Sequence, residues 1–208
     1  MYQHTKQYIT AGASPENARG ALVMLHGRGG TAQNIISLAD GLNVADMAIY
    51  APQAGNQSWY PYSFMAEESQ NQPALDSALE VIDDLVKKIE ADGIPARRIY
   101  FTGFSQGACL TLEYIARNAQ RFGGAAAFTG GLIGKQLIMS RYQGDFAGTP
   151  VFIGTGDPDP HVPLTRVNET VEILKKLNAE VTVKVYPGRP HTILQEEIEL
   201  ANQLVFSV

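Results

Sequence analysis

The stretch RRIYFTGFSQGACLTLEYIARN, from Arg97 to Asn118, places a serine between two glycines where a strand-like pattern changes to a helix-like one. Its first part, IYFTGF, is nearly continuous in apolar character, which is typical of a strand buried on both faces. A helix is expected to begin directly after Ser105. A serine at such a junction is either an ordinary cap of the helix or a nucleophile presented on a tight turn.

The glycines on either side of Ser105 favour the second interpretation. The segment GFSQG matches the pattern G-x-S-x-G, in which a sharp turn from strand to helix lifts the hydroxyl out of the sheet. We expect side chains at positions 103 and 107 to collide with neighbouring backbone, which would explain both glycines. The start of a helix also directs free N–H groups and the positive end of its dipole toward the serine oxygen.

The rest of the chain repeats the change from strand to helix. Apolar runs predict buried strands at 21–25, 47–51, 99–104, 124–128 and 151–153, and the alternating VTVKV predicts a strand nearer the sheet edge at 181–185. Apolar residues at three- and four-residue steps predict helices over 73–93, 164–174 and 194–205. This alternation predicts a single three-layer α/β domain with a mainly parallel sheet, extending over residues 1–208.

The composition narrows the class of protein. Of the 208 residues, 45% are hydrophobic and 18% charged, which suits a folded domain with a substantial core. A formal net charge of -5 without a run of lysine or arginine argues against nucleic-acid binding. The start is too polar for a signal peptide and no apolar run approaches the roughly 18 residues of a membrane span, so a cytoplasmic protein is expected. Cys109 is the only cysteine, which excludes an internal disulfide, and its place in an apolar helix predicts a buried thiol.

A serine becomes a strong nucleophile when a base removes its proton, so a histidine is expected beside it. The carboxyl ends of parallel strands meet at one edge of the sheet, and His191 follows the strand 181–185 and the turn PGRP. His161 lies on another loop at this edge. We expect His4 to be solvated in the polar N-terminal segment, and His26 to brace the glycine-rich turn after the first buried strand. His191 is therefore the predicted base.

The remaining catalytic groups are sought on neighbouring loops. The loop GTGDPDPHVP offers Asp157 and Asp159 as the carboxylate that would orient the imidazole. The chain order Ser, Asp, His is that of the α/β-hydrolase fold. The backbone N–H groups of Gln106 and of Arg28, in the loop HGRGGT, are predicted to hold the oxyanion. That loop lacks the lysine and spacing of a P-loop, so a nucleotide site is not expected.

A family resemblance rests on the segments LVMLHGRGG, YAPQA, IYFTGFSQGACLTLEY, TGDPDPHVP and YPGRPHTI, which together span nearly the whole chain. On these segments the chain resembles the phospholipase/carboxylesterase family of α/β-hydrolases, which includes the acyl-protein thioesterases. The resemblance implies a compact serine hydrolase without a large cap domain, which needs no metal or organic cofactor. It also implies cleavage of carboxylic esters and, in some members, of thioesters.

The resemblance assigns roles to individual residues. Ser105 is the nucleophile, His191 is the base, and Arg28 and Gln106 are the oxyanion donors. The family loop reads roughly H-G-x-x-D-P-x-V-P, and laying TGDPDPHVP on it puts the catalytic aspartate at Asp159. Asp157 then becomes a loop-structuring residue, and Thr155 stands where the family has histidine.

Arg28 and one later segment also depart from the family pattern. Arg28 stands where an apolar or small residue is usual, so its side chain would either attract an acidic or polar substrate or be solvated or salt-bridged. The segment NQSWYPYSFMAEES lacks the aspartate that commonly follows the tryptophan and an aromatic residue. Its Trp59 and Tyr60 are predicted to bind substrate in an acyl or aromatic-ester pocket, with packing under the loop or a homodimer contact as alternatives.

These features predict a serine hydrolase that acts through an acyl-enzyme on a small-molecule ester or thioester. A lactone hydrolase of the dienelactone type is an alternative, less favoured because the nucleophile is serine. A catalytically silent α/β-hydrolase scaffold that binds a ligand or partner is another. A binding module, however, has no need of the full set of serine, aspartate and histidine.

Overall fold

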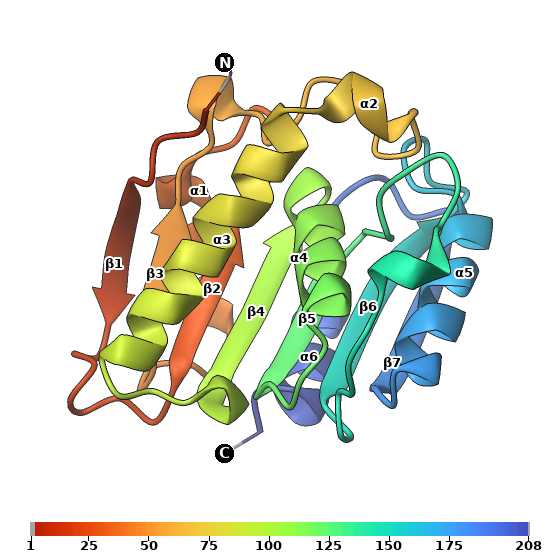
Figure 1. Cartoon of the computed structure of the whole chain (residues 1–208). Coiled ribbons are helices and arrows are strands. Elements are labelled where there is room, and N and C mark those ends of the chain that lie inside the picture. Colours follow the sequence, from red (N-terminus) through yellow and green to blue (C-terminus); the bar gives the residue numbers. More distant parts are fainter. Residues whose placement is uncertain (1–2, 208) are drawn as a thin grey trace.

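The computed structural model describes residues 3–207, and its strands form one seven-stranded sheet (Figure 1). The strands are β1 (Tyr8–Gly12), β2 (Ala21–Leu25), β3 (Ala48–Pro52), β4 (Ile99–Phe104), β5 (Gly124–Phe128), β6 (Pro150–Asp157) and β7 (Glu180–Pro187). They lie in the order β1-β3-β2-β4-β5-β6-β7. Only β1 runs antiparallel to its neighbour within the described residues, so the expected mainly parallel sheet is confirmed. Residues 1, 2 and 208 of the predicted domain lie outside the described residues.

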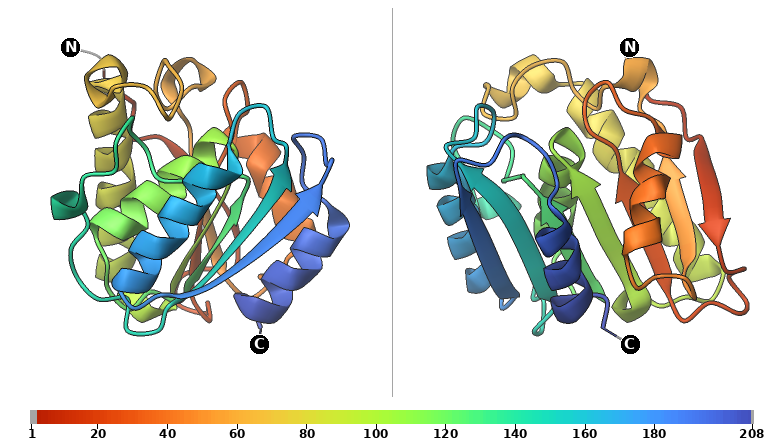
Figure 2. Two further views of the ribbon diagram at one scale, coloured as in Figure 1. Left: turned by 90° about the vertical axis from the view of Figure 1, so that its right-hand side faces the viewer. Right: turned by 180° about the vertical axis from the view of Figure 1, so that it is seen from behind.

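Helices cover both faces of this sheet. They are α1 (Ala32–Ile36), α2 (Glu68–Asn71), α3 (Ala74–Ala91), α4 (Gln106–Arg117), α5 (Leu164–Lys176) and α6 (Gln195–Leu204). Helices α3, α4 and α5 lie on one face, and the view from behind shows α1 and α6 on the other (Figure 2). The predicted helices over 73–93, 164–174 and 194–205 are thereby confirmed.

Alternation of side chains along the strands produces the two cores of this three-layer arrangement. Val23 and Leu25 of β2 point into the core beneath α3, α4 and α5, whereas Leu22 and Met24 point into the core beneath α1 and α6. All four side chains are fully buried. A strand with both faces covered in this way reads as a continuous apolar run, which is why the sequence reveals it.

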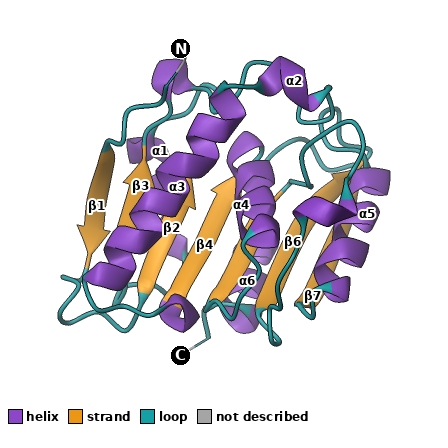
Figure 3. Cartoon of the chain, in the orientation of Figure 1, coloured by secondary structure: helices purple, strands orange, loops and turns teal. Residues whose placement is uncertain are grey.

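The structure adds details to the predicted strands. All of them are confirmed, and the run at 151–153 is the centre of the eight-residue strand β6. The edge strand β1 was not predicted, because YITAG carries a mixed pattern and remains partly exposed. Figure 3 shows that, within residues 3–207, loops and the four-residue helix α2 surround the carboxyl edge of the sheet, without a large cap domain.

Candidate active site

Ser105 occupies the turn between β4 and α4, with a positive φ of 54°. A Cβ atom on Gly107 would lie 2.0 Å from the Leu25 carbonyl oxygen, and one on Gly103 would lie 2.5 Å from the carbonyl oxygen of Gly107. The expected collision with backbone is therefore confirmed at both positions. The Ser105 side chain makes no capping hydrogen bond to α4, so this serine is not an ordinary helix cap.

The structure brings Ser105, His191 and Asp159 together from three separate loops. The Nε2 atom of His191 lies 2.8 Å from the Ser105 Oγ, and its Nδ1 atom lies 2.8 Å from the Asp159 Oδ2. With the imidazole proton on Nδ1, that N–H donates to the carboxylate and leaves Nε2 to accept the serine proton. Asp157 is exposed and stands outside this arrangement.

Asp159 is held from two sides. Its second oxygen, Oδ1, accepts the backbone N–H groups of His161 at 2.8 Å and Val162 at 2.9 Å. Burial alone would raise the pKa of the Asp159 carboxyl, but the hydrogen bonds from His191, His161 and Val162 outweigh it and lower the pKa below its ordinary value. These hydrogen bonds favour the ionised form of the carboxyl and fix its position.

The loop that carries His191 is anchored by a buried ion pair between Arg189 and Glu197. The Arg189 guanidinium donates to Glu197, to the Thr192 carbonyl oxygen at 2.7 Å, and to the Thr129 hydroxyl at 2.6 Å. Glu197 also accepts the Leu194 N–H at 2.8 Å. The side chains of the ion pair are 2% and 0% exposed, so the attachment is shielded from solvent. It connects the His191 loop to Thr129, the residue directly after β5, and to α6.

Sequence reasoning missed this ion pair. The position of Glu197, three residues after Leu194 at the start of a helix, is a signal for a carboxylate that reaches back to the first N–H groups. Nothing in the local pattern identifies Arg189 as its partner, because the pair forms only when the last loop folds over the sheet. Burial raises the pKa of the Glu197 carboxyl, and the Leu194 N–H and Arg189 oppose that shift.

A cavity of about 620 Å³ opens in front of Ser105. Its lining comprises Gly27, Arg28, Tyr60, Pro61, Tyr62, Ser63, Phe64, Phe104, Ser105, Gln106, Cys109, His161, Val162 and His191. A second cavity of about 550 Å³ shares Gly27, Arg28 and Phe104 with the first and reaches toward Ile35 and Leu38. The two cavities therefore adjoin each other at these shared residues.

The two predicted substrate-binding aromatics differ in position. Both side chains are buried, but Tyr60, 1% exposed, belongs to the lining of the cavity in front of Ser105, whereas Trp59, 0% exposed, does not. The indole N–H of Trp59 donates to the His26 carbonyl oxygen at 2.9 Å. Of the interpretations offered for Trp59, packing under the loop is the one that matches its position.

Gln106 and Arg28, the predicted oxyanion donors, both line the cavity and use their side chains to hold its wall. The Gln106 amide accepts the Trp59 N–H at 2.9 Å and donates to the Tyr60 carbonyl oxygen at 2.8 Å. The Arg28 guanidinium donates only to neutral oxygens of residues 58–62, and no carboxylate of residues 3–207 lies within ion-pair distance of it. The alternative of a salt-bridged Arg28 is therefore wrong for the described residues.

His4 and His26 lie outside the relay, and both are buried among backbone groups to which their rings hydrogen-bond. His4 is buried, and its Nδ1 accepts the Gly55 N–H at 3.0 Å while Nε2 lies 2.9 Å from the Trp59 carbonyl oxygen. The expectation that His4 is solvated is therefore wrong. His26 is buried as well and accepts the Ala54 N–H at 3.1 Å, which confirms that it braces the adjoining loops. Burial lowers the pKa of both rings and favours the neutral form that such contacts require.

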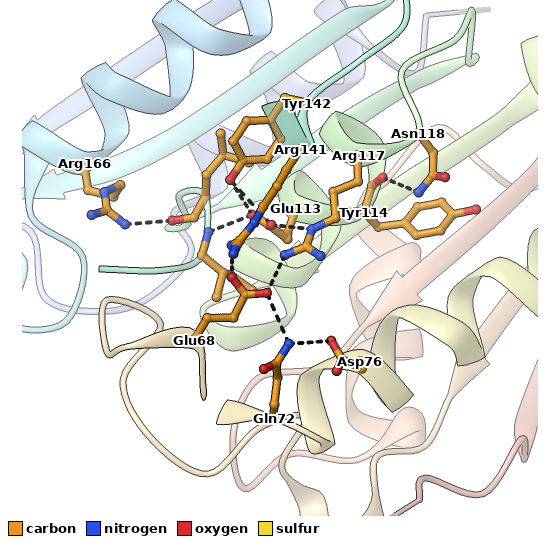
Figure 4. Close-up of polar contacts among 12 residues, drawn as sticks. Glu68, Gln72, Asp76, Glu113, Tyr114, Arg117, Asn118, Arg141, Tyr142 and Arg166 are labelled. Atoms are coloured by element: carbon orange, nitrogen blue, oxygen red, sulfur yellow. Dashed lines mark hydrogen bonds and ion pairs between the residues drawn. The ribbon is translucent and has the colours of Figure 1, made fainter. Parts of the chain in front are cut away.

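A polar network lies between α4, α2 and the segment after β5 (Figure 4). Glu113 of α4 is fully buried and accepts from Arg117 at 2.6 Å and from the Tyr142 hydroxyl at 3.3 Å. Arg117 also reaches Glu68 of α2 at 3.4 Å, and Arg141 pairs with the same carboxylate. The network therefore joins α4, α2 and the segment after β5.

Helix α2 is hydrogen-bonded to the cavity lining through its last residue. Asn71, its last residue, is fully buried, accepts the Tyr62 N–H at 2.9 Å and donates to the Ser63 carbonyl oxygen at 2.9 Å.

Cys109 also lines the cavity, with 2% of its surface exposed, and burial raises the pKa of its thiol to about 12. A thiol that stays protonated is a poor nucleophile, so Cys109 is not a candidate for that role.

The sheet order and the serine turn after a central strand define an α/β-hydrolase. The chain belongs to the phospholipase/carboxylesterase family, whose model matches residues 4–205. The resemblance seen in the sequence, the α/β-hydrolase fold and the expectation of a hydrolytic enzyme of this family are thereby confirmed.

Individual relatives support this assignment. The chain is 28% identical over 222 residues to acyl-protein thioesterase 1 of Debaryomyces hansenii, with 96% of each protein covered. It is 62% identical to a phospholipase/carboxylesterase from Dyadobacter fermentans, whose crystal structure matches with a TM-score of 0.98 over 100% of this chain and 99% of that one. The crystal structure of esterase PE8 shares the fold, with a TM-score of 0.80 at 22% identity over 97% of each chain.

Among residues 3–207, no helix has the length and apolar character needed to traverse a lipid bilayer.

Proposed function

We propose that this protein is a serine esterase in which Ser105 is the nucleophile, His191 the general base and Asp159 the group that orients the imidazole. The observation that carries the proposal is the continuous relay of two 2.8 Å contacts through His191. Each member comes from a different loop, and the serine is raised on a turn whose glycines leave no room for side chains. Such a geometry serves acyl transfer, whereas a binding module gains nothing from it.

The reaction follows from this arrangement. As the Ser105 oxygen bonds to the ester carbonyl carbon, His191 takes the hydroxyl proton and the carbonyl oxygen becomes an oxyanion. The backbone N–H groups of Gln106 and Arg28 are the proposed donors to that oxyanion, each worth about 3 kcal/mol in the transition state. His191 then gives its proton to the departing alcohol. In the second half it activates a water, which hydrolyses the acyl-enzyme and releases the acid.

The substrate class is supported by the cavity and by the relatives. A volume of about 620 Å³ in front of Ser105 accommodates a small or medium ester. Relatives named acyl-protein thioesterase and probable carboxylesterase indicate that oxygen esters and thioesters are the first compounds to test. Tyr60 is the proposed aromatic contact of the substrate, because it lines the cavity.

The test is hydrolysis of 4-nitrophenyl butyrate by the wild-type protein and by the Ser105→Ala variant. We expect turnover by the wild type and a loss of at least about a thousandfold in kcat for the variant. Ser140→Ala removes an exposed hydroxyl outside the cavity and should leave turnover unchanged. Retention of activity in a folded Ser105→Ala protein would overturn the proposal.

A further inference from the structure

Arg28 places a positive charge in the lining of the cavity that contains Ser105. Its Nη1 donates to the Ser58 hydroxyl at 3.0 Å and to the Pro61 carbonyl oxygen at 2.9 Å, and its Nη2 donates to the Tyr62 carbonyl oxygen at 2.7 Å. All of these acceptors are neutral, so the guanidinium keeps its full charge. These contacts fix its position without an opposite charge.

The same contacts leave part of the guanidinium available. Three of its five N–H donors are used within residues 3–207, and the Nε–H and one Nη2–H remain. Two N–H groups are what a carboxylate needs for a two-point, charge-assisted contact. Arg28 is exposed as a residue, so a ligand in the cavity can reach it.

Within residues 3–207, no carboxylate forms an ion pair with Arg28. The lining of the cavity includes no aspartate or glutamate, and the carboxylate behind it, Asp159, is engaged by His191 and is 9% exposed. Arg28 therefore contributes a positive charge to this lining, in a chain whose formal net charge is -5, and that charge favours an anionic ligand.

We propose that the preferred substrates are esters that also carry a carboxylate, which pairs with Arg28 while Ser105 attacks the ester carbonyl. This inference rests on the esterase function proposed above and names its substrate class. A merely structural role, in which Arg28 only holds residues 58–62, would require its hydrogen bonds but not its charge. The two roles are therefore separable by experiment.

The experiment compares matched pairs of esters. Mono-4-nitrophenyl adipate and 4-nitrophenyl hexanoate have acyl chains of equal length and differ in a terminal carboxylate. 4-Carboxyphenyl hexanoate and phenyl hexanoate place the same difference on the alcohol side. For each pair the quantity measured is the ratio of kcat/KM for the acidic ester to kcat/KM for its neutral partner, which cancels effects common to both substrates.

For the wild type we expect the acidic ester to be favoured in one of the two pairs, and added salt to lower that preference because it screens the charge. Arg28→Gln should reduce the ratio about two- to fivefold, the effect of losing one exposed ion pair. Arg28→Lys keeps the charge without the fixed fork and should retain most of the ratio. The control is Arg97→Gln, which makes the same charge change at the opposite edge of the sheet and should leave the ratio unaltered.

Two results would overturn the inference. One is a wild type with no preference for the acidic ester of either pair, and the other is an Arg28→Gln ratio equal to that of Arg97→Gln. Neither result would contradict the proposed esterase function, provided that hydrolysis of 4-nitrophenyl hexanoate still depends on Ser105. Absence of all ester hydrolysis would instead refute the proposed function itself. If Arg28→Gln fails to fold, the salt dependence in the wild type and the Arg28→Lys ratio decide the matter.

Discussion

The turn that carries Ser105 and the loop that carries His191 meet at one site but are held by different forces. The serine turn is fixed by local sterics, since glycine at 103 and 107 lets backbone segments approach within distances that a Cβ would prevent. The histidine loop is fixed by a buried ion pair between Arg189 and Glu197, which also reaches Thr129. The steric constraint involves five consecutive residues and can be recognised in the sequence, whereas the ion pair forms only in the folded chain.

The largest expected effect tests the histidine loop through its carboxylate. Asp159→Asn should reduce kcat by about ten-thousandfold, because an amide no longer selects the imidazole tautomer that accepts the serine proton. Asp157→Asn, two residues away and exposed, should change kcat less than about twofold. Steady-state hydrolysis of 4-nitrophenyl butyrate gives both values. A larger loss for Asp157→Asn would mean that the wrong aspartate has been assigned.

The second effect tests the anchor of the same loop. Arg189→Met should lower the free energy of unfolding by about 3–5 kcal/mol, because it leaves the Glu197 carboxyl buried without its cation. The control Lys184→Met removes a partner of Glu196 of α6, with side chains 45% and 55% exposed, and should cost less than about 1 kcal/mol. Urea unfolding measures both.

The pH dependence of Arg189→Met sharpens this test. Burial already raises the native pKa of Glu197, and loss of Arg189 removes an interaction that lowers it. A group with a native pKa above its unfolded value favours the folded state at low pH and loses that contribution as pH rises through the native pKa. The penalty of Arg189→Met should therefore be smaller at pH 5 than at pH 8. An equal penalty at both would contradict the role given to Glu197.

The third effect tests the serine turn. Gly107→Ala should destabilise the protein by about 3 kcal/mol, since its Cβ would lie within 2.6 Å of three backbone atoms. Gly93→Ala is the comparison, because that glycine has a positive φ of 96° with no atom within 4 Å of the added Cβ. It should cost only the backbone strain, about 1 kcal/mol. Equal costs in thermal or urea unfolding would show that the glycines of the turn are not sterically required.

The smallest effect concerns the stability of the protein in acid. The native pKa of Asp159 is lowered, so its contribution to stability is present above the unfolded pKa of about 4 and is lost as pH falls through the native value. Asp159→Asn should therefore lose less stability than the wild type between pH 5 and pH 2. Unfolding curves at several pH values compare the two, and parallel losses would show that Asp159 is not stabilised as an anion.

The same contrast explains what the sequence could predict. The parallel strands, the main helices and the serine turn are predicted because their signals are local: apolar runs, periodicity and paired glycines. Trp59 was expected in a pocket and is buried outside its lining, and His4 was expected in solvent and is buried. Each depends on which segment covers it, and a polar local sequence does not disclose that. The ion pair of Arg189 and Glu197 and the neutral partners of Arg28 depend on contacts of the same long-range kind.

Covalent labelling with a fluorophosphonate tests the central claim most directly, because the probe reacts with a serine only where a base activates its oxygen. Intact-mass and peptide mass spectrometry should show one adduct per chain, located on Ser105, with labelling strongly slowed in His191→Ala. No adduct on a folded wild-type protein, or an adduct on another residue, would contradict the account.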